Sequence, residues 1–156
     1  MKLINKYKNL ELIISDELLQ KLGEIGIKQY PKEFGGFLIG YYSDNLKTLT
    51  IINYLLPKKY RSLSFIFERS IEGIKEVFDN LFKAKRHYYV GEWHTHPNGS
   101  TMYSQTDLKA MTEIEKCETV KINNPVLLIL SIDRENIIDT GFYLYNNKKL
   151  IPYGKN

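Results

Sequence analysis

The chain has 156 residues and a mass of 18.3 kDa, with 43% hydrophobic and 26% charged residues. That length can bury a substantial core, and the composition is ordinary for a soluble globular protein. Twelve tyrosines and seven phenylalanines argue against disorder. The 22 basic and 18 acidic residues leave a net charge of only +4 without a dense basic block, so we do not expect nucleic acid as the partner.

The single cysteine, Cys117, excludes an intrachain disulfide, which fits a reducing cytosol. The N-terminal stretch lacks the apolar core of a signal peptide, and no apolar run approaches the ~20 residues that span a membrane. We therefore expect a cytoplasmic protein without a membrane partner. No linker, repeat or low-complexity tract divides the sequence, which predicts one domain over residues 1–156.

The first half of the chain predicts one helix between extended segments. The apolar run Leu10–Ile14 indicates a strand, and Ser15 is a candidate N-cap for a helix that runs to about Gln29. The segment Glu33–Gly40 contains paired glycines and indicates a buried extended stretch that another backbone can approach closely. Further strands are expected at Thr48–Leu56 and Ser64–Phe67.

The second half mixes helices and strands. Apolar residues recur every three or four positions from Ile71 to Phe82, which predicts an amphipathic helix. The remaining expected elements are a strand at Tyr88–His94, a loop at Pro97–Ser100, a helix from Ser104 to about Cys117, and a strand pair at Val126–Asp133 and Ile138–Tyr145. Three helices and roughly six strands without strict alternation predict an α/β (α+β) fold, a mixed sheet flanked by helices.

Two of the three histidines lie one residue apart in the segment GEWHTHPNGSTMYSQTD, Gly91–Asp107. If the strand persists to His96, then His94 and His96 project from the same face. Two imidazoles on one face can begin a zinc site, and a helix that opens at Ser104 could bring Asp107 to complete the set. Three protein ligands leave a fourth position for water, which is typical of a catalytic zinc ion.

Other interpretations of these residues stay open. The tetrapeptide from Ser104 to Asp107 is by itself a helix-capping pattern, and capping can coexist with function. A zinc-bound water needs a proton acceptor, and periodicity alone does not choose between Glu92 and a distant glutamate. We expect Glu92 at the start of its strand, facing solvent or a basic neighbour. Outside the pattern, we expect His87 at the surface and Trp93 in the core or partly exposed.

The spacing His-x-His-Pro at residues 94–97, followed by Ser-x-x-Asp at residues 104–107, resembles the signature of the JAMM (JAB/MPN+) metalloproteases. The wording Gly-Glu-Trp-His-x-His-Pro is similar to the small prokaryotic JAB branch, and the order of elements matches over nearly the whole chain. This resemblance implies an MPN/JAB-type, cytidine-deaminase-like mixed sheet. It implies one catalytic zinc ion held by His94, His96 and Asp107, with Ser104 as the oxyanion donor and Glu33 as general base and acid.

The resemblance also implies an activity. Eukaryotic members of this family cleave the isopeptide bond between ubiquitin and lysine, and they use inserted segments to hold ubiquitin. Here the segment Glu118–Asn124 is too brief for a large insert. Small prokaryotic members accompany ubiquitin-like proteins or E1- and E2-like enzymes, as in CBASS and ubiquitin-like antiphage operons. The implied function is therefore an isopeptidase that removes a ubiquitin-like protein, or the C-terminus of a conjugated protein, from a target lysine.

Other functions stay possible at this point. The same site could trim a linear ubiquitin-like or sulfur-carrier precursor. The RadC branch of DNA-associated proteins shares the pattern, and metal-free relatives act as scaffolds, although the intact ligand set argues against a scaffold. For a peptidase, the substrate tail would lie extended beside a sheet edge, and the candidate walls are Gly35-Gly36 and Arg61–Phe67.

Overall fold

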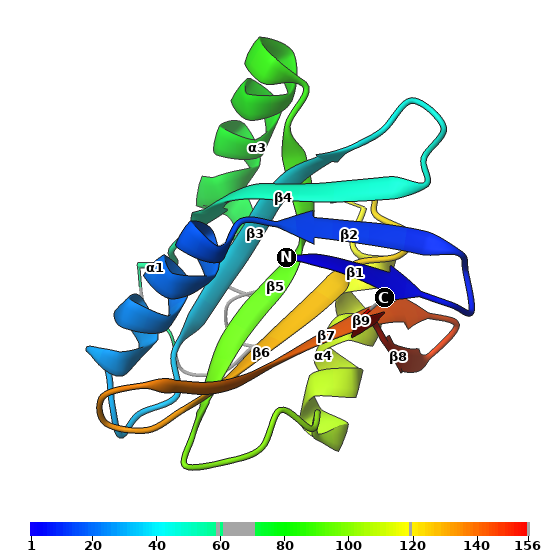
Figure 1. Ribbon diagram of the computed structural model, residues 1–156. Coiled ribbons are helices and arrows are strands. Elements are labelled where there is room, and N and C mark those ends of the chain that lie inside the picture. The colour runs from blue at the N-terminus through cyan, green and yellow to red at the C-terminus, as the bar shows by residue number, and fades with distance from the viewer. Residues whose placement is uncertain (59, 61–70, 119, 156) are drawn as a thin grey trace.

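The computed structural model of the protein describes residues 1–58, 60, 71–118 and 120–155. Within these residues the chain forms nine strands and three helices (Figure 1). The strands are β1 (Lys2–Asn5), β2 (Leu10–Ile14), β3 (Gly35–Tyr42), β4 (Thr48–Leu55), β5 (Tyr88–Pro97), β6 (Val126–Ile132), β7 (Ile137–Asn146), β8 (Lys149–Pro152) and β9 (Gly154–Lys155). The helices are α1 (Asp16–Ile27), α3 (Ile71–Lys85) and α4 (Gln105–Lys116).

All nine strands belong to one mixed sheet with the order β8-β7-β6-β5-β3-β4-β2-β1-β9. Two neighbouring pairs, β2–β4 and β5–β6, are parallel, and the other pairs are antiparallel. The predicted fold class, a mixed sheet flanked by helices, is confirmed. β5 lies inside the sheet between β3 and β6, so both of its edges are hydrogen-bonded and its path is fixed.

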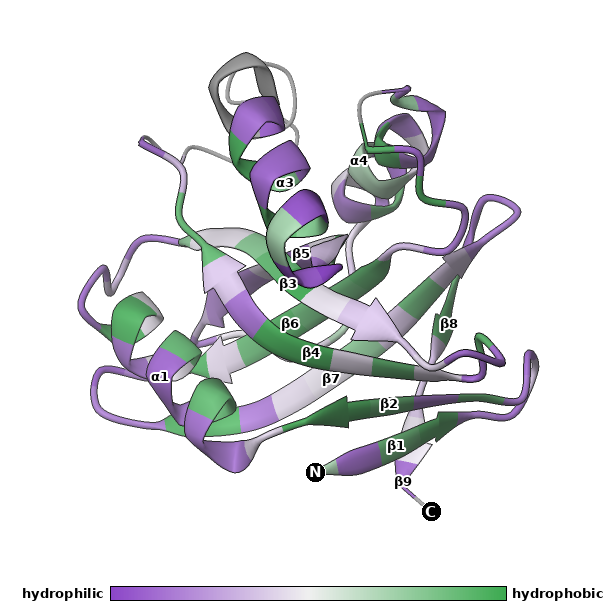
Figure 2. Ribbon diagram, turned by 90° about the horizontal axis from the view of Figure 1, so that it is seen from above, coloured by the Kyte–Doolittle hydropathy of each residue, from purple (hydrophilic) through white to green (hydrophobic). Residues whose placement is uncertain are grey.

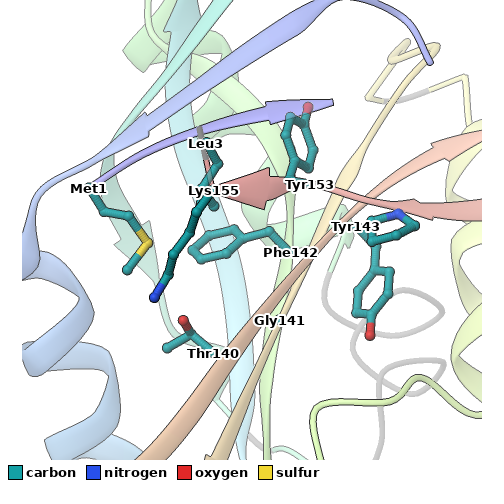
Figure 3. A pocket seen from close by; sticks show the side chains of 9 residues that line it. Met1, Leu3, Thr140, Gly141, Phe142, Tyr143, Tyr153 and Lys155 are labelled. Atoms are coloured by element: carbon teal, nitrogen blue, oxygen red, sulfur yellow. The ribbon is translucent and has the colours of Figure 1, made fainter. Parts of the chain in front are cut away.

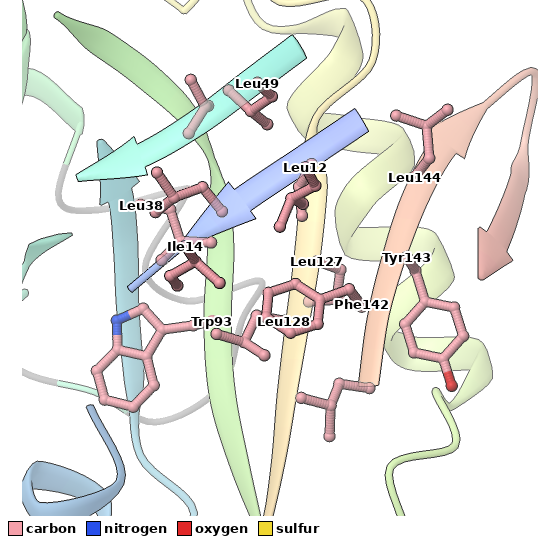
Figure 4. Close-up of a cluster of buried hydrophobic side chains, with 14 of the residues drawn as sticks. Leu12, Ile14, Leu38, Leu49, Trp93, Leu127, Leu128, Phe142, Tyr143 and Leu144 are labelled. Atoms are coloured by element: carbon pink, nitrogen blue, oxygen red, sulfur yellow. The ribbon is translucent and has the colours of Figure 1, made fainter. Parts of the chain in front are cut away.

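The last residues of the chain connect the two ends of the sheet. β8 pairs with β7 and β9 pairs with β1, and only Tyr153 separates β8 from β9. The two ends of the strand order are therefore consecutive in the chain. Apolar side chains from strands far apart in sequence meet in one buried cluster (Figure 4), which includes Leu12, Ile14, Leu38, Trp93, Leu128 and Phe142. This core stabilises the strands that carry the polar site.

The predicted elements agree with the structure except at the edges of the sheet. The helices and the β6–β7 pair are confirmed, and Ser15 caps α1 by accepting a hydrogen bond from the Leu18 amide at 3.0 Å. α1 ends at Ile27 rather than Gln29, and β5 continues past His94. The short strands β1, β8 and β9 were not predicted, so the estimate of about six strands was too low. The strand predicted at Ser64–Phe67 lies outside the described residues.

The helices divide between the two faces of β5. Figure 2 shows α3 and α4 on the same side of the sheet. Phe78 of α3 packs edge-on against Phe37 of β3, which is the cross-strand partner of Glu92. α1 packs on the other face, because a Cβ added to Gly26 would meet the side chain of Thr95. In the described part of the chain, no helix is both long enough and apolar enough to cross a membrane.

Candidate metal centre

The two histidines lie at the end of β5 and face the same side. His94 is fully buried and His96 is partly buried, and their Nε2 atoms are 2.9 Å apart. The strand continues through His96 to Pro97, so the predicted same-face arrangement is confirmed. β5 pairs with β6 through both residues, which fixes the backbone under the two imidazoles. The paired backbone of β5 therefore already holds the two Nε2 atoms close together.

The paired glycines that open β3 allow this strand to lie close to His94. Gly35 is the cross-strand partner of His94, and a Cβ added to Gly35 would meet the Trp93 carbonyl oxygen and the His94 Cα and Cβ atoms. A Cβ added to Gly36 would meet the Leu55 carbonyl oxygen. Any larger residue at Gly35 would move either the strand or the histidine.

Helix α4 brings an acidic residue to the same point. Ser104 is its N-cap, with Oγ accepting a hydrogen bond from the Asp107 amide at 3.1 Å, while the Ser104 amide donates to Asp107 Oδ2 at 2.7 Å. The other oxygen, Asp107 Oδ1, lies 3.5 Å from His94 Nε2. The capping interpretation is confirmed, and the cap itself holds the carboxylate beside the histidines.

Hydrogen bonding and burial set the state of the imidazoles. His96 Nδ1 lies 2.8 Å from the Ser100 carbonyl oxygen. Because a carbonyl only accepts, Nδ1 carries the proton and Nε2 presents its lone pair to the site. Burial lowers the pKa of His94 well below its usual value, and the charge of Asp107 opposes this shift only in part. A neutral imidazole is the form that binds a metal ion.

The three side chains fit a zinc ion. His94, His96 and Asp107 each offer one ligand atom, and these atoms all lie within 4.8 Å of one another. Tetrahedral zinc with bonds of ~2.0–2.1 Å would place its ligand atoms about 3.4 Å apart. His94 Nε2 lies 2.9 Å from His96 Nε2 and 3.5 Å from Asp107 Oδ1, and the nearest Asp107 oxygen that is recorded for His96 Nε2, Oδ2, lies at 3.9 Å. Two imidazoles and one carboxylate are a donor set typical of catalytic zinc. The third histidine, His87, is half-buried, outside this group, and stacks on Tyr41 with 5.5 Å between ring centroids.

Glu33 lies two residues before the start of β3, and its side chain reaches the edge of the His94, His96 and Asp107 group. Its side chain is 43% exposed, and its Oε1 lies 4.0 Å from His94 Nε2. The hydroxyl of Tyr60 donates a hydrogen bond to the same Oε1 at 2.9 Å. Partial burial raises the pKa of Glu33, and the hydrogen bond from Tyr60 acts in the opposite direction. The structure thus brings Glu33 to the predicted ligands, although its role as base stays a prediction.

Ser104 can donate a hydrogen bond while it caps the helix. Ser104 is exposed, and its Oγ accepts the hydrogen bond from the Asp107 amide. A hydroxyl has one proton to donate and two lone pairs, so capping leaves the proton available for a further acceptor. The geometry is therefore compatible with the predicted oxyanion donor, which stays a prediction.

The expectation for Glu92 was wrong. Glu92 is fully buried: Tyr89 Oη donates to its Oε1 at 2.8 Å, and its Oε2 has no hydrogen-bond partner among the described residues. The reason is that β5 begins four residues before Glu92, and α3 packs on that face of the sheet. Burial raises the pKa of Glu92 well above its usual value. Trp93, on the opposite face, is fully buried, as expected of a core residue.

Two groups at the site could not have been found from the sequence pattern. The Ser100 carbonyl orients His96, and Tyr60 contacts Glu33 across 27 positions of chain. Neither contact leaves a spacing or compositional signal. Figure 3 shows a separate pocket, which Phe142 of β7 and Tyr153 help to line. This pocket contains none of the predicted site residues.

Comparison with known proteins identifies the class. The family model described as prokaryotic homologs of the JAB domain matches residues 15–139, so the chain belongs to this family, as its resemblance predicted. One relative, named a CD-NTase/cGAS isopeptidase, comes from Enterobacter hormaechei subsp. hoffmannii (strain UCI 50). It is 32% identical over 123 residues, which cover 78% of this chain and 68% of the relative.

Solved structures share the fold. A protein from Desulfitobacterium hafniense has a TM-score of 0.63 at 13% identity, covering 92% of this chain and 90% of its own. A protein from Salinibacter ruber (strain DSM 13855) has a TM-score of 0.59 at 18% identity, covering 92% and 87%. At these identities the likeness concerns the arrangement of helices and strands alone.

Proposed function

We propose that the protein is a zinc-dependent isopeptidase. It removes a ubiquitin-like protein, or the C-terminus of a conjugated protein, from a lysine of its target, in a bacterial antiphage conjugation system. The observation that carries this proposal is the convergence of His94 Nε2, His96 Nε2 and Asp107 Oδ1, with Glu33 4.0 Å from the first. The name of the 32% identical relative, CD-NTase/cGAS isopeptidase, supports the choice of reaction.

The proposed chemistry is hydrolysis of an amide bond. A zinc ion held by the two histidines and Asp107 would supply an activated water and polarise the scissile carbonyl. Glu33 accepts the proton of the attacking water and delivers it to the lysine ε-nitrogen as the carbon–nitrogen bond breaks. The products are a free carboxylate and a free amine. The raised pKa of Glu33 suits a group that must both accept and return a proton.

Ser104 stabilises the charge that develops on the carbonyl oxygen. Its hydroxyl oxygen is engaged by the Asp107 amide, so the donor direction of the hydroxyl is constrained. A donor fixed in advance needs little reorganisation during the reaction, which is why such groups contribute strongly to catalysis.

The substrate is a flexible C-terminal tail, and the proposed partners include E1- and E2-like enzymes in the cytoplasm. The tail lies extended and is recognised by main-chain hydrogen bonds. The Gly35-Gly36 start of β3, which adjoins His94, is a proposed wall of this path. The other candidate wall, Arg61–Phe67, lies outside the described residues. We propose that residues 1–156 act as one catalytic domain.

A substrate trap tests the proposal. Glu33→Ala is expressed in the native host beside the neighbouring genes, captured, and its bound proteins are identified by mass spectrometry, with the wild-type protein as matched control. We expect enrichment of a protein whose lysine carries a C-terminal remnant. Enrichment of a linear precursor alone would instead support the processing peptidase. DNA recovery that falls steeply with salt would support the DNA-associated alternative.

A further inference from the structure

The carboxylate of the candidate base, Glu33, accepts one hydrogen bond from the described residues. Glu33 lies outside β3 and its side chain is 43% exposed, so neither the sheet ladder nor close packing fixes its carboxylate. The hydroxyl of Tyr60 donates to Oε1 at 2.9 Å, and the same oxygen is the one 4.0 Å from His94 Nε2. No other described residue donates a hydrogen bond to this carboxylate.

Tyr60 is itself connected to the strand that carries the metal ligands. Its ring packs against Phe34 with centroids 5.5 Å apart, and Phe34 packs edge-on against the buried Trp93 at 6.2 Å. The Phe34 backbone is also bonded to Thr95, because the Thr95 amide donates to the Phe34 carbonyl at 2.8 Å. The aromatic rings thus join Tyr60 to Trp93 on one side of His94, and the Phe34 backbone joins it to Thr95 on the other side.

The Tyr60 hydroxyl stays protonated and can therefore donate a hydrogen bond. Burial raises the pKa of Tyr60 far above its usual value, and the neighbouring Glu33 carboxylate raises it further. The phenol therefore keeps its proton throughout the range in which proteins work. A protonated phenol beside a carboxylate can only donate to it, so the direction of this hydrogen bond is fixed.

We propose that Tyr60 is a positioning residue: its hydroxyl, held by Phe34 and Trp93, keeps the Glu33 carboxylate at the metal centre. This inference rests on the proposed function, in which Glu33 is the base. It assigns Tyr60 no contact with metal or substrate. A rotamer change of this exposed carboxylate would move it by more than 1 Å, and a displacement of that size can cost about 100-fold in rate.

The test combines a double-mutant cycle with structures. Wild type, Tyr60→Phe, Glu33→Gln and the double variant are assayed with zinc on a synthetic branched peptide whose C-terminal glycine is joined to a lysine ε-amine. Tyr60→Phe keeps the ring and removes only the hydroxyl. We expect kcat to fall about 10- to 100-fold with KM nearly unchanged, and no further fall when Tyr60→Phe is added to Glu33→Gln.

Two further measurements separate positioning from folding. Zinc affinity and thermal stability are expected to stay within about twofold and a few degrees of wild type, and zinc-loaded crystal structures should show Glu33 ordered in wild type and displaced in Tyr60→Phe. Tyr145→Phe, which removes a hydroxyl contact to Thr112 at 3.2 Å, is the matched control and should leave kcat unchanged.

Several outcomes would overturn the inference. Equal losses from Tyr60→Phe in the presence and absence of the Glu33 carboxylate would mean that Tyr60 does not act through Glu33. An unmoved Glu33 carboxylate in the Tyr60→Phe structure would have the same meaning. Full activity of Glu33→Gln would instead refute the proposed base. The crystal structures of wild type and Tyr60→Phe would then show whether the Tyr60 hydroxyl positions the Glu33 carboxylate.

Discussion

The two halves of the candidate site are built differently. The ligand half, His94, His96 and Asp107, comes from 14 consecutive residues, with His94 fully buried and Asp107 nearly so. The base half, Glu33, comes from a distant part of the chain, is 43% exposed and is held by the side chain of Tyr60. A metal site needs ligands that do not move, whereas a proton carrier must reach both a water and a leaving group. The difference in burial matches this difference in task.

The largest expected effect comes from removing a buried ligand. His94→Ala deletes the imidazole that lies 2.9 Å from His96 Nε2 and 3.5 Å from Asp107 Oδ1, so stoichiometric zinc binding and all hydrolysis should be lost. Zinc is measured by competition with a chromophoric chelator, and folding by circular dichroism. Retained zinc at wild-type affinity in a folded variant would show that zinc binds at a site that does not include His94.

Glu33→Gln is expected to separate the two halves. Activity should fall by about 10²–10⁴-fold, because the amide cannot accept a proton, while zinc affinity stays near that of wild type. Parallel measurement of turnover and zinc affinity checks this. A joint loss of zinc and activity would place Glu33 among the ligands and remove the distinction between the halves.

In the proposed mechanism Ser104 joins the ligand half to catalysis, and two substitutions separate its capping role from its proposed catalytic role. Ser104→Ala should lower kcat about 10²–10³-fold and destabilise the fold by ~1 kcal/mol, because it removes both the hydroxyl donor and the helix cap. Ser104→Gly should lower kcat as much but cost only a few tenths of a kcal/mol. Urea denaturation and single-turnover rates measure the two effects. Near-normal kcat in either variant would contradict the oxyanion role.

The smallest expected effect concerns stability rather than catalysis. Burial raises the pKa of the native Glu92 carboxyl, so this group ionises at a higher pH in the fold than in the unfolded chain, where its ordinary pKa is 4.5. Between the two pKa values, the contribution of Glu92 to the free energy of unfolding therefore falls by up to about 1.4 kcal/mol per pH unit as the pH rises. Glu92→Gln has no such term, so its stability relative to wild type should increase from pH 5.5 to pH 7.5 in zinc-free urea denaturation. A constant difference would show that Glu92 ionises in the fold.

The sequence could predict the ligand half because its geometry is local. Alternation along a strand places His94 and His96 on one face, and Ser-x-x-Asp opens a helix, whatever the rest of the chain does. Glu33 could be proposed only from the family resemblance, since its approach depends on how β3 pairs with β5. Tyr60 could not be proposed at all, because its contact with Glu33 depends on tertiary packing.

The fold shows the same limit. Apolar periodicity located α1 and α3, and the Ser-x-x-Asp pattern located the start of α4. It missed β1, β8 and β9, which are two to four residues long and take their stability from neighbours far away in sequence. The burial of Glu92 was misjudged for the same reason, because only the packing of α3 reveals which residues of β5 are covered.

The cap of α4 has a consequence for the choice of ion. Asp107 Oδ2 accepts the Ser104 amide hydrogen bond at 2.7 Å and lies 3.9 Å from His96 Nε2, whereas Oδ1 lies 3.5 Å from His94 Nε2. A cation that binds both carboxylate oxygens, as Ca²⁺ often does, would have to share Oδ2 with the Ser104 amide. An ion that needs only one oxygen and two nitrogen ligands from the protein would leave the first turn of α4 intact. The cap of α4 would therefore favour an ion that binds Asp107, a residue of this helix, through one carboxylate oxygen.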